Sequence, residues 1–367
     1  MELFEPHADQ AALHLALGDL VAATDRELAE RDLYRQAARS ALYGPRWRAA
    51  GIKPDQLHGR EALRRLPFIE GQDLLAMAAS QANLRKALLA RPRAWVTSRG
   101  SPAPAKKWLP LTLDDSAHWF SRARRALELV TGSDEQGGEA LFLAMNEAMP
   151  HVSNALPYLW ERADYLAGPR RFEFLIAATS MLWRNHWERF ALQKQPAWLA
   201  GSVADARLLA RELGDDVELL VSPPGRGLFW GEPLDSADLA AGAPAPATRR
   251  ELQETFGLVE TFSLYLSAEC REMYAECPAH DGLHLWMDGA IHEIVPAGAD
   301  RAEALFVDQA PAGLEGEYVF TGWGEALPLV RYRTGDRIRV VSAEPCPCGC
   351  THPRVQFLGR MAAANAG

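Results

Sequence analysis

The chain has 367 residues, of which 48% are hydrophobic and 24% are charged, and its formal net charge is -9. A chain of this length can bury a large core and is long enough for about two domains, and its acidic excess argues against a nucleic-acid partner. No window approaches the roughly 18 apolar residues of a membrane span, and MELFEPHADQ lacks the pattern of a secretion signal, so we expect a cytoplasmic protein with no nucleic-acid or membrane partner.

The first third of the chain predicts mainly helices. Leu and Ala recur with helical spacing over residues 8–40, which predicts two helices that cover a core. A turn and loop follow in YGPRWRAAGIKPDQL, and a further helix follows Pro67. The stretch RAWVTS predicts a short strand that runs into the loop TSRGSPAPAKK. After that loop, LDDSAHWFSRARRALELVTG predicts a helix with an acidic first turn and a glycine stop.

The middle of the chain alternates strands with helices. ALFLAMN predicts a buried strand and HVSNALPYLWERADYL a helix, and two later stretches beginning at PAWLAGS and VELLVSP each predict a strand followed by a helix. This alternation predicts a mostly parallel sheet covered on both faces. After about residue 260, the short runs GLHLWMDG, IHEIVPAG, GEYVFTGW and RIRVVSA predict an antiparallel β subdomain. The tail AAANAG is expected to be disordered.

Two stretches carry candidate nucleotide-binding residues. LPLVRYRTGDRIRV places an apolar strand before a turn at Thr334-Gly335-Asp336, and a carboxylate held there can accept two hydrogen bonds from a vicinal diol such as a ribose. In ETFGLVE, the ring of Phe256 can stack on a purine and the nearby Glu260 can hold Mg²⁺ through water. Simpler alternatives fit both stretches, namely an ordinary β-turn and an amphipathic helix that turns its Phe inward.

Two further stretches give weaker signals. In FWGEPLD, Gly231 lets the backbone approach a flat ligand closely. Loops that cradle phosphates favour Gly, Ser, Thr and Lys. In TSRGSPAPAKK only Gly100 is glycine, while Pro102 and Pro104 have no N–H to offer. This loop is therefore either a remodelled phosphate loop or a surface loop with solvated lysines.

The five cysteines are unevenly placed. Cys270 and Cys277 are close in sequence, and CPCGC contains Cys346, Cys348 and Cys350. In a cytosolic protein such clustering favours metal binding over disulfides. CPC offers two thiolates on a tight turn and CPAHDGLH can supply two more ligands, which suits tetrahedral Zn²⁺. The alternative is a set of free, reduced cysteines.

Taken together and in chain order, the segments described above resemble those of the adenylate-forming superfamily, which contains acyl-CoA synthetases, adenylation domains and luciferases. More narrowly, they resemble its phenylacetate-CoA ligase branch. YGPRWRAAGI and LRRLPF are similar to the branch's N-terminal signature, and FWGEPL to its Gly-Gly-Glu-Pro segment. FGLVE is similar to the aromatic-Gly-x-Thr-Glu motif, with Val259 where Thr is usual. The later segments that match are ECPAHDGLHLWMDGAIHEIVP, YVFTGWGEALPLVRYRTGD, CPCG and FLGR.

The resemblance covers most of the chain and implies an α/β fold. Residues 1–262 would form a helix-covered core with mostly parallel sheets, residues 263–360 a β-rich subdomain with a zinc site, and residues 361–367 a flexible tail. It implies ATP-dependent adenylation of an aromatic carboxylic acid, for transfer to an amine or thiol. The implied cofactors are ATP, Mg²⁺ and a structural Zn²⁺.

The resemblance also implies roles for individual residues. Glu260 and Lys106 would be catalytic. The implied nucleotide-binding residues are Thr97, Ser98, Gly100, Ser101, Gly231, Glu232, Pro233, Phe256, Gly257, Asp336 and Arg360. The acyl pocket is expected near His151, Trp198 and Gly201. The implied zinc ligands are Cys277, His284, Cys346 and Cys348, with Cys350, His280 and Cys270 as reserves.

The sequence departs from the family in two ways. The family's phosphate loop reads roughly TSGTTGKP, whereas here prolines and extra residues are inserted. Relatives continue into a mobile C-terminal domain that supplies a catalytic lysine, whereas this sequence ends at FLGRMAAANAG. Loss of one such donor costs on the order of 10²–10³ in rate. We therefore expect slow activity, a lysine from another chain, or a substitute in Lys106 or Lys107.

In lacking the family's C-terminal domain, the sequence resembles atypical adenylating proteins of phenazine antibiotic biosynthesis. This resemblance implies a phenazine carboxylic acid as the substrate. It further implies a homodimer, or a partner enzyme that supplies the role of the absent domain. The alternative hypothesis is a carrier or partner protein that retains a nucleotide or aryl-acid pocket but does not turn over. Pyrophosphate exchange separates the two hypotheses, whereas nucleotide binding alone does not.

Overall fold

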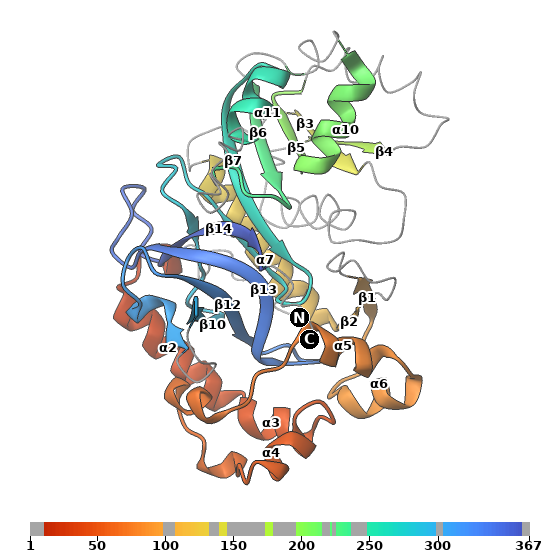
Figure 1. Ribbon diagram of the computed structural model, residues 1–367, viewed down its shortest axis with the longest axis vertical. Helices are drawn as coiled ribbons and strands as arrows, with labels where there is room; N and C mark the ends of the chain where they lie inside the picture. Colours follow the sequence, from red (N-terminus) through yellow and green to blue (C-terminus); the bar gives the residue numbers. More distant parts are fainter. Residues whose placement is uncertain are drawn as a thin grey trace. The chain divides into compact units, whose positions relative to one another are not determined.

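The computed structural model describes residues 11–97, 107–131, 139–144, 173–178, 196–214, 221, 225–235, 248–298 and 304–361. The chain divides into two compact units, and each contains most of one six-stranded sheet (Figure 1). Unit 1 consists of Met1–His118, Ser267–Glu272 and His284–Gly367, and unit 2 consists of Trp119–Leu266 and Met273–Leu283. None of the helices in the described ranges combines the length and the apolar character that crossing a bilayer requires.

The N-terminal part of unit 1 is helical. The Leu and Ala spacing produces α2 (Leu17–Glu30) and α3 (Leu33–Arg39), as predicted for residues 8–40. The other elements here are α4 (Gly44–Ala49), α5 (Gly71–Ala78), α6 (Gln81–Ala87) and 3₁₀ helices at Ala12–His14, Pro54–Gln56 and Arg60–Arg65. Side chains define two of the starts, because Glu70 and Asp73 form a capping box on α5 and the Ser80 hydroxyl accepts a hydrogen bond from the amide of Asn83 on α6.

A two-stranded hairpin flanks the loop TSRGSPAPAKK. Its strands, β1 (Ala94–Thr97) and β2 (Trp108–Leu111), pair antiparallel, and α7 (Leu113–Thr131) follows directly. Thr112 and Asp115 cap this helix reciprocally, each side chain accepting the other's backbone N–H. The Asp115 carboxylate also accepts the amides of Glu325 and Ala326. The start of α7 therefore holds a loop that is distant in sequence.

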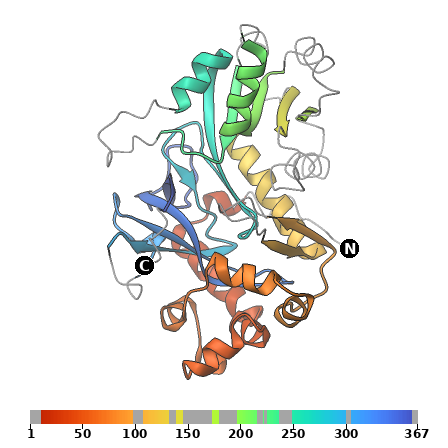
Figure 2. The same ribbon diagram turned by 45° about the vertical axis from the view of Figure 1, so that its right-hand side comes forward.

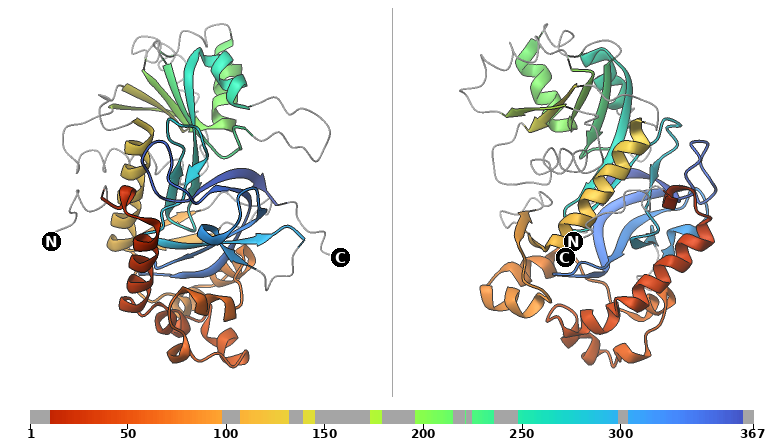
Figure 3. Two further views of the ribbon diagram at one scale, coloured as in Figure 1. Left: turned by 90° about the vertical axis from the view of Figure 1, so that its left-hand side faces the viewer. Right: turned by 180° about the vertical axis from the view of Figure 1, so that it is seen from behind.

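The sheet of unit 1 has the strand order β11-β10-β12-β13-β14-β9, and the pairs from β11 to β14 are antiparallel. This confirms the predicted antiparallel β region. The Tyr43 hydroxyl donates to the carbonyl of Pro328 and accepts from the amide of Val330, which ties the helical part to the sheet. Figure 3 shows α2 along this sheet, where Leu20 packs on Met287. The strands are β9 (Leu283–His284), β10 (Ala290–Pro296), β11 (Leu305–Phe306), β12 (Glu315–Gly322), β13 (Leu329–Ser342) and β14 (Arg354–Arg360), with a 3₁₀ helix at Val307–Gln309.

The sheet of unit 2 has the order β4-β3-β5-β6-β7-β8, and its pairs from β4 to β7 are parallel. This confirms the predicted parallel sheet. The helices α10 (Val203–Leu213) and α11 (Thr248–Phe256) lie side by side on one face (Figure 2), where Leu199, Phe229 and Leu252 share a buried core. The helix predicted from HVSNALPYLWERADYL lies outside the described residues. The strands are β3 (Glu139–Ala144), β4 (Glu173–Ala178), β5 (Trp198–Ser202), β6 (Gly225–Trp230), β7 (Leu258–Ser267) and β8 (Glu272–Ala275).

Candidate functional site

The carboxyl edge of the parallel sheet in unit 2 contains two of the predicted residues. Gly201 pairs with Phe229 near the ends of β5 and β6, and Gly231 follows β6 directly. Gly231 has φ of +91°, a left-handed conformation that favours glycine. Ligands of open α/β sheets bind outside the carboxyl ends of the strands. The structure therefore brings Gly201 and Gly231 to the edge where a ligand is expected.

Glu260 and Trp198 lie at the opposite, amino end of the same sheet. Trp198 is the first residue of β5 and pairs with Arg226, which pairs in turn with Glu260 near the start of β7. The Arg226 guanidinium lies over the Trp198 ring at 5.5 Å and 3.5 Å from the Glu260 carboxylate. Neither Glu260 nor Trp198 therefore shares the carboxyl edge with Gly231.

Phe256 and Glu232 are both engaged within the protein. Phe256 is 1% exposed and belongs to the core beneath α10 and α11, so its ring has no face open to a purine. This is the amphipathic-helix alternative of the sequence analysis. Gly257, with φ of +63°, ends α11 and lets the chain turn into β7. Glu232, which precedes Pro233, accepts a 2.6 Å hydrogen bond from Arg207, and Arg207 also binds Glu251.

A polar pocket of about 540 Å³ surrounds Glu260. His280, in a left-handed conformation, stacks on Phe262 and contacts both Glu276 and Glu260. The hydrogen bond with Glu276 raises the pKa of His280, against the opposing effect of burial. Arg249 pairs with Asp235 and Glu276. The charged residues of the pocket are thus paired with one another, and its lining consists of Arg226, Asp235, Arg249, Gln253, Val259, Glu260 and His280.

In unit 1, the turn at Thr334-Gly335-Asp336 lies inside a long strand. The sequence predicts that the strand ends there, but β13 continues to Ser342 because Gly335 takes φ of +76° without breaking the ladder to β14. The Thr334 hydroxyl donates to the Tyr318 carbonyl and accepts from the Asp336 amide. The Gly335 amide donates to Glu317 and its carbonyl accepts from Met361. Hydrogen bonds from Thr334, Gly335 and Asp336 therefore hold the turn in place.

The structure brings Asp336 and Arg360 together. They are cross-strand partners on β13 and β14, and the Arg360 Nε lies 3.1 Å from Oδ1 of Asp336. Arg360 also donates to the carbonyl of Thr334 at 2.7 Å. The Arg360 side chain is 56% exposed, whereas that of Asp336 is largely buried. The pair thus presents a held carboxylate beside an accessible guanidinium.

Lys107 was considered from the sequence as a substitute lysine, but its buried partner Glu269 near this turn was missed. The Lys107 ammonium lies 2.7 Å from the Glu269 carboxylate and 3.2 Å from the Tyr332 hydroxyl. Lys107 is 5% exposed, and Glu269 follows the carboxyl end of β7. Burial and the charge of Glu269 raise the pKa of Tyr332 well above its usual range, so its phenol stays neutral. The sequence did contain a signal for Glu269. Like FGLVE, the stretch YLSAE (residues 265–269) has five residues, contains an aromatic residue and ends on Glu.

Of the residues predicted in the loop TSRGSPAPAKK as phosphate contacts, only Thr97 lies within the described residues. Thr97 ends β1 and pairs with Trp108 on β2, so the two ends of the loop are held together. The other predicted loop residues, Ser98, Gly100, Ser101 and Lys106, lie outside the described residues, and so does His151 of the predicted acyl pocket.

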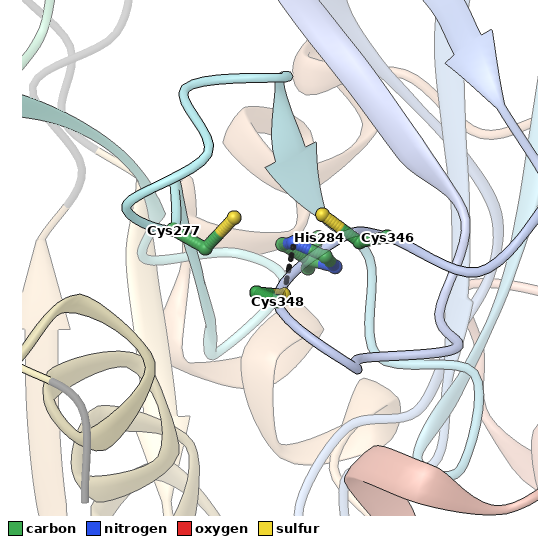
Figure 4. Close-up of side chains that lie close together, drawn as sticks. All are labelled: Cys277, His284, Cys346 and Cys348. Carbon is green, nitrogen blue, oxygen red and sulfur yellow. Dashed lines mark hydrogen bonds between the residues drawn. The ribbon is translucent and has the colours of Figure 1, made fainter.

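The predicted zinc ligands meet in space. The ligand atoms of Cys277, His284, Cys346 and Cys348 all lie within 4.8 Å of one another (Figure 4). His284 is fully buried, and its Nε2 lies 3.7 Å from the Cys348 sulfur. Its Nδ1 has no hydrogen-bond partner among the described residues. Three thiols, one imidazole and an unsatisfied buried nitrogen suit a closed tetrahedral metal site.

The chain matches no protein-family model. Over 137 residues it is 35% identical to the phenylacetate-coenzyme A ligase of Thermus thermophilus, and this stretch covers 35% of the chain and 28% of that ligase. The structure of 2-hydroxyisobutyryl-CoA ligase in the postadenylation state with R3-HIB-AMP gives a TM-score of 0.72 at 17% identity, over 95% of this chain and 69% of that chain. The acyl acid amido synthetase AtGH3.15 in complex with 2,4-DB gives 0.63 at 14% identity, over 98% and 72%. The chain therefore has the fold of adenylate-forming ligases.

Proposed function

We propose that this protein activates a carboxylic acid with ATP, forming an acyl-adenylate and pyrophosphate. The observation that carries the proposal is the fixed turn that holds Asp336 beside Arg360, in a fold shared with a ligase that holds an acyl-adenylate. In this reaction an oxygen of the carboxylate attacks the α-phosphorus and pyrophosphate leaves. The protein contributes mainly positioning and stabilisation of charge.

The arrangement supports a division of roles in unit 1. The Asp336 carboxylate would accept hydrogen bonds from the two ribose hydroxyls, because the turn and Arg360 hold it in place. The exposed guanidinium of Arg360 would meet a phosphate or the new acyl-phosphate bond. In unit 2, Gly231 and Gly201 would let a flat group approach the carboxyl edge of the sheet.

We propose Glu269 rather than Glu260 as the carboxylate that supports Mg²⁺. Glu269 follows the carboxyl end of β7, whereas Glu260 lies near its amino end and faces Arg226 and His280. The ammonium of Lys107 already lies beside Glu269. Lys107 would therefore supply positive charge to the phosphates, which is the role that the sequence analysis assigned to Lys106 or Lys107.

We propose an aromatic acid as the substrate, with phenazine carboxylic acids as one class to test. The support is the similarity to a phenylacetate-coenzyme A ligase over 137 residues. The acceptor would be a thiol or an amine, because the similar structures are named a CoA ligase and an amido synthetase. We also propose that Cys277, His284, Cys346 and Cys348 hold a structural Zn²⁺, because the donor set suits it.

ATP–pyrophosphate exchange tests the proposed activity. Protein purified with zinc would be assayed with phenylacetate, benzoate, phenazine-1-carboxylate and 2-hydroxyisobutyrate. We expect exchange that depends on an aromatic acid and falls by at least about 10²-fold in Asp336→Ala, because each pairing with the ribose would be lost. Asp55→Ala, at an exposed aspartate on a 3₁₀ helix, is the matched control. Exchange with the aliphatic acid alone would refute the aromatic substrate.

One observation favours a second function, binding without turnover. Lys107 covers the carboxylate of Glu269, the group that would otherwise support Mg²⁺. A protein of this kind would bind ATP or an aryl acid, and Asp336→Ala would weaken the binding of ATP. It would show no exchange with any acid of the panel, and that result would replace the first proposal.

A further inference from the structure

The fifth cysteine lies beside the proposed metal site but is not among its four ligands. Cys350 is 1% exposed and lies two positions after Cys348, with Gly349 between them. Of the four ligands, Cys348 is the exposed one, while the other three are buried. An accessible ligand thiol thus has a protected second thiol next to it.

The turn that carries these residues is held by its own backbone hydrogen bonds. The amide of Gly349 donates to the Cys346 carbonyl, and the amide of Cys346 donates to the Cys350 carbonyl, both at 2.8 Å. Two residues separated by one other have Cα atoms at most about 7.6 Å apart, and the left-handed Gly349, with φ of +86°, bends the chain between them. A disulfide requires Cα atoms roughly 4.4–6.8 Å apart, so Cys348 and Cys350 can be joined by a local rearrangement.

We propose that Cys348 and Cys350 are a peroxide-sensitive thiol pair, in which oxidation of Cys348 releases the metal and the disulfide with Cys350 keeps that release reversible. The proposal rests on the proposed zinc site and is independent of the adenylation activity. Metal-bound thiols are deprotonated, and oxidation favours thiolates that are accessible to solvent. Cys348 meets both conditions, and Cys350 is positioned to resolve the product.

The reaction balances with a hydroperoxide as the oxidant. The Cys348 thiolate attacks one oxygen of hydrogen peroxide, the O–O bond breaks, and the departing hydroxide takes a proton to become water. Cys348 is then a sulfenic acid and no longer a good metal ligand. The Cys350 sulfur attacks the Cys348 sulfur, and the hydroxyl group leaves as water with the Cys350 proton. Two sulfurs lose two electrons in total and one peroxide is reduced to two waters.

Oxidation would also weaken contacts with the N-terminal segment. The Gly349 carbonyl is hydrogen-bonded to His14 at 2.9 Å, and the Thr351 amide donates to the Leu13 carbonyl at 2.9 Å. The Thr351 hydroxyl reaches the carbonyls of Leu13 and Leu15. Movement of residues 348–350 would therefore loosen residues 13–15, and limited proteolysis near them should become faster.

The test compares the wild-type protein with Cys350→Ser, which keeps all four proposed ligands. Zinc content is first measured by mass spectrometry, and release is then followed with a chromogenic chelator after excess hydrogen peroxide. We expect similar release rates, within about twofold, because the first oxidation occurs at Cys348 in both. In wild type we expect a Cys348–Cys350 disulfide, and dithiothreitol with zinc should restore the metal. In Cys350→Ser, Cys348 should advance to the sulfinic acid and recovery should fail.

Cys270→Ser is the matched control, because it removes a buried cysteine outside the four proposed ligands and should behave as wild type. Three results would overturn the proposal. They are a disulfide that excludes Cys350, equal recovery of wild type and Cys350→Ser, and wild-type protein that holds no zinc. Because none of these readouts involves adenylation, a failed exchange assay leaves the test intact.

Discussion

Glu317 is the residue on which the geometry of the Asp336 turn depends most directly. One of its oxygens accepts the Gly335 amide, and the other accepts the guanidinium of Arg333. Arg333 in turn binds Glu70 in the capping box of α5. A chain of charged contacts therefore runs from a helix start to the proposed ribose site.

We predict that Glu317→Gln raises KM for ATP by roughly tenfold or more and changes kcat by less than about threefold. Loss of a charge-assisted hydrogen bond costs about 1.5–3 kcal/mol, and here that loss loosens the turn without removing Asp336. The measurement is steady-state exchange at varied ATP. Glu315→Gln, at a neighbouring position on β12 that binds Arg337 and Arg339, is the control and should leave KM unchanged. A fall in kcat alone would contradict the prediction.

Asp115 is expected to govern part of the acid stability. Burial raises the pKa of this carboxyl, but Arg271 and hydrogen bonds from Thr112, Glu325 and Ala326 outweigh it, so the pKa lies below the usual 3.8. A lowered pKa means that the stabilisation is complete above pH 3.8 and is lost as the pH falls through the folded value. Asp115 should therefore stabilise the protein at neutral pH and not in strong acid.

We predict that Asp115→Asn lowers the free energy of unfolding by about 3–5 kcal/mol at pH 7, because the buried Arg271 loses its charged partner. The difference from wild type should begin to shrink below about pH 3.8, where the carboxyl of the unfolded chain is protonated, and should disappear below the lower pKa of the folded protein. Urea unfolding at several pH values measures both effects. Asp114→Asn, at the exposed neighbour, should be neutral throughout. A difference that persists unchanged into strong acid would show that shape rather than charge is responsible.

At the scale of elements, β12 lies so close to β10 that one position has no room for a side chain. A Cβ atom on Gly316 would come within 2.1 Å of the Val295 carbonyl oxygen, which is backbone and cannot rotate away. Gly316 pairs with Pro296 in this register, so the strands would have to separate locally. Close packing of this kind is a property of the pair of strands rather than of one residue.

We predict that Gly316→Ala lowers the free energy of unfolding by about 1–3 kcal/mol through overpacking. Gly18→Ala on α2 is the control, because nothing lies within 4 Å of its Cβ position. It should be neutral or stabilising by up to about 1 kcal/mol. Urea unfolding of the two variants gives the comparison, and equal stabilities would contradict the strand geometry.

The elements also show how far the sequence can be interpreted by itself. Helical and strand periodicity predicted the parallel and antiparallel sheets. The family resemblance of the CPC and CPAHDGLH segments implied four cysteine and histidine positions that do meet in space. Asp336 and Arg360 were each predicted by the family resemblance to lie near the nucleotide, but their pairing across β13 and β14 was not predicted.

Other features depend on tertiary contacts that the sequence does not reveal. Glu260 and Glu269 each end a similar five-residue stretch of sequence. They lie at opposite ends of β7, and this follows only from where the strand begins and ends. The contact of Glu269 with Lys107 joins positions that are 162 residues apart in the chain. Phe256 is buried because α11 packs beside α10, and no property of ETFGLVE itself distinguishes a stacking ring from a core ring.

At the scale of the whole molecule, the proposed metal joins two distant segments, residues 277–284 and 346–348. We predict that a chelator which removes zinc lowers Tm by roughly 4–12 °C, corresponding to a loss of about 2–3 kcal/mol. Differential scanning calorimetry with and without the chelator makes the measurement. Cys346→Ser should already be destabilised and should not respond further. An unchanged Tm in zinc-loaded wild type would show that the metal does not support the fold.

The division of the chain has a consequence for how the protein is made. Unit 1 joins Met1–His118 to His284–Gly367, so Tyr43 and Arg60 meet Pro328 and Asp308 only after most of the chain has left the ribosome. Translation at about 5–20 residues per second delays this meeting by on the order of ten seconds or more. Unit 2, whose residues are nearly contiguous, can collapse meanwhile. Apolar surface such as Trp47 and Leu63 stays in water during that delay, so nascent unit 1 should be the part of the protein that engages chaperones.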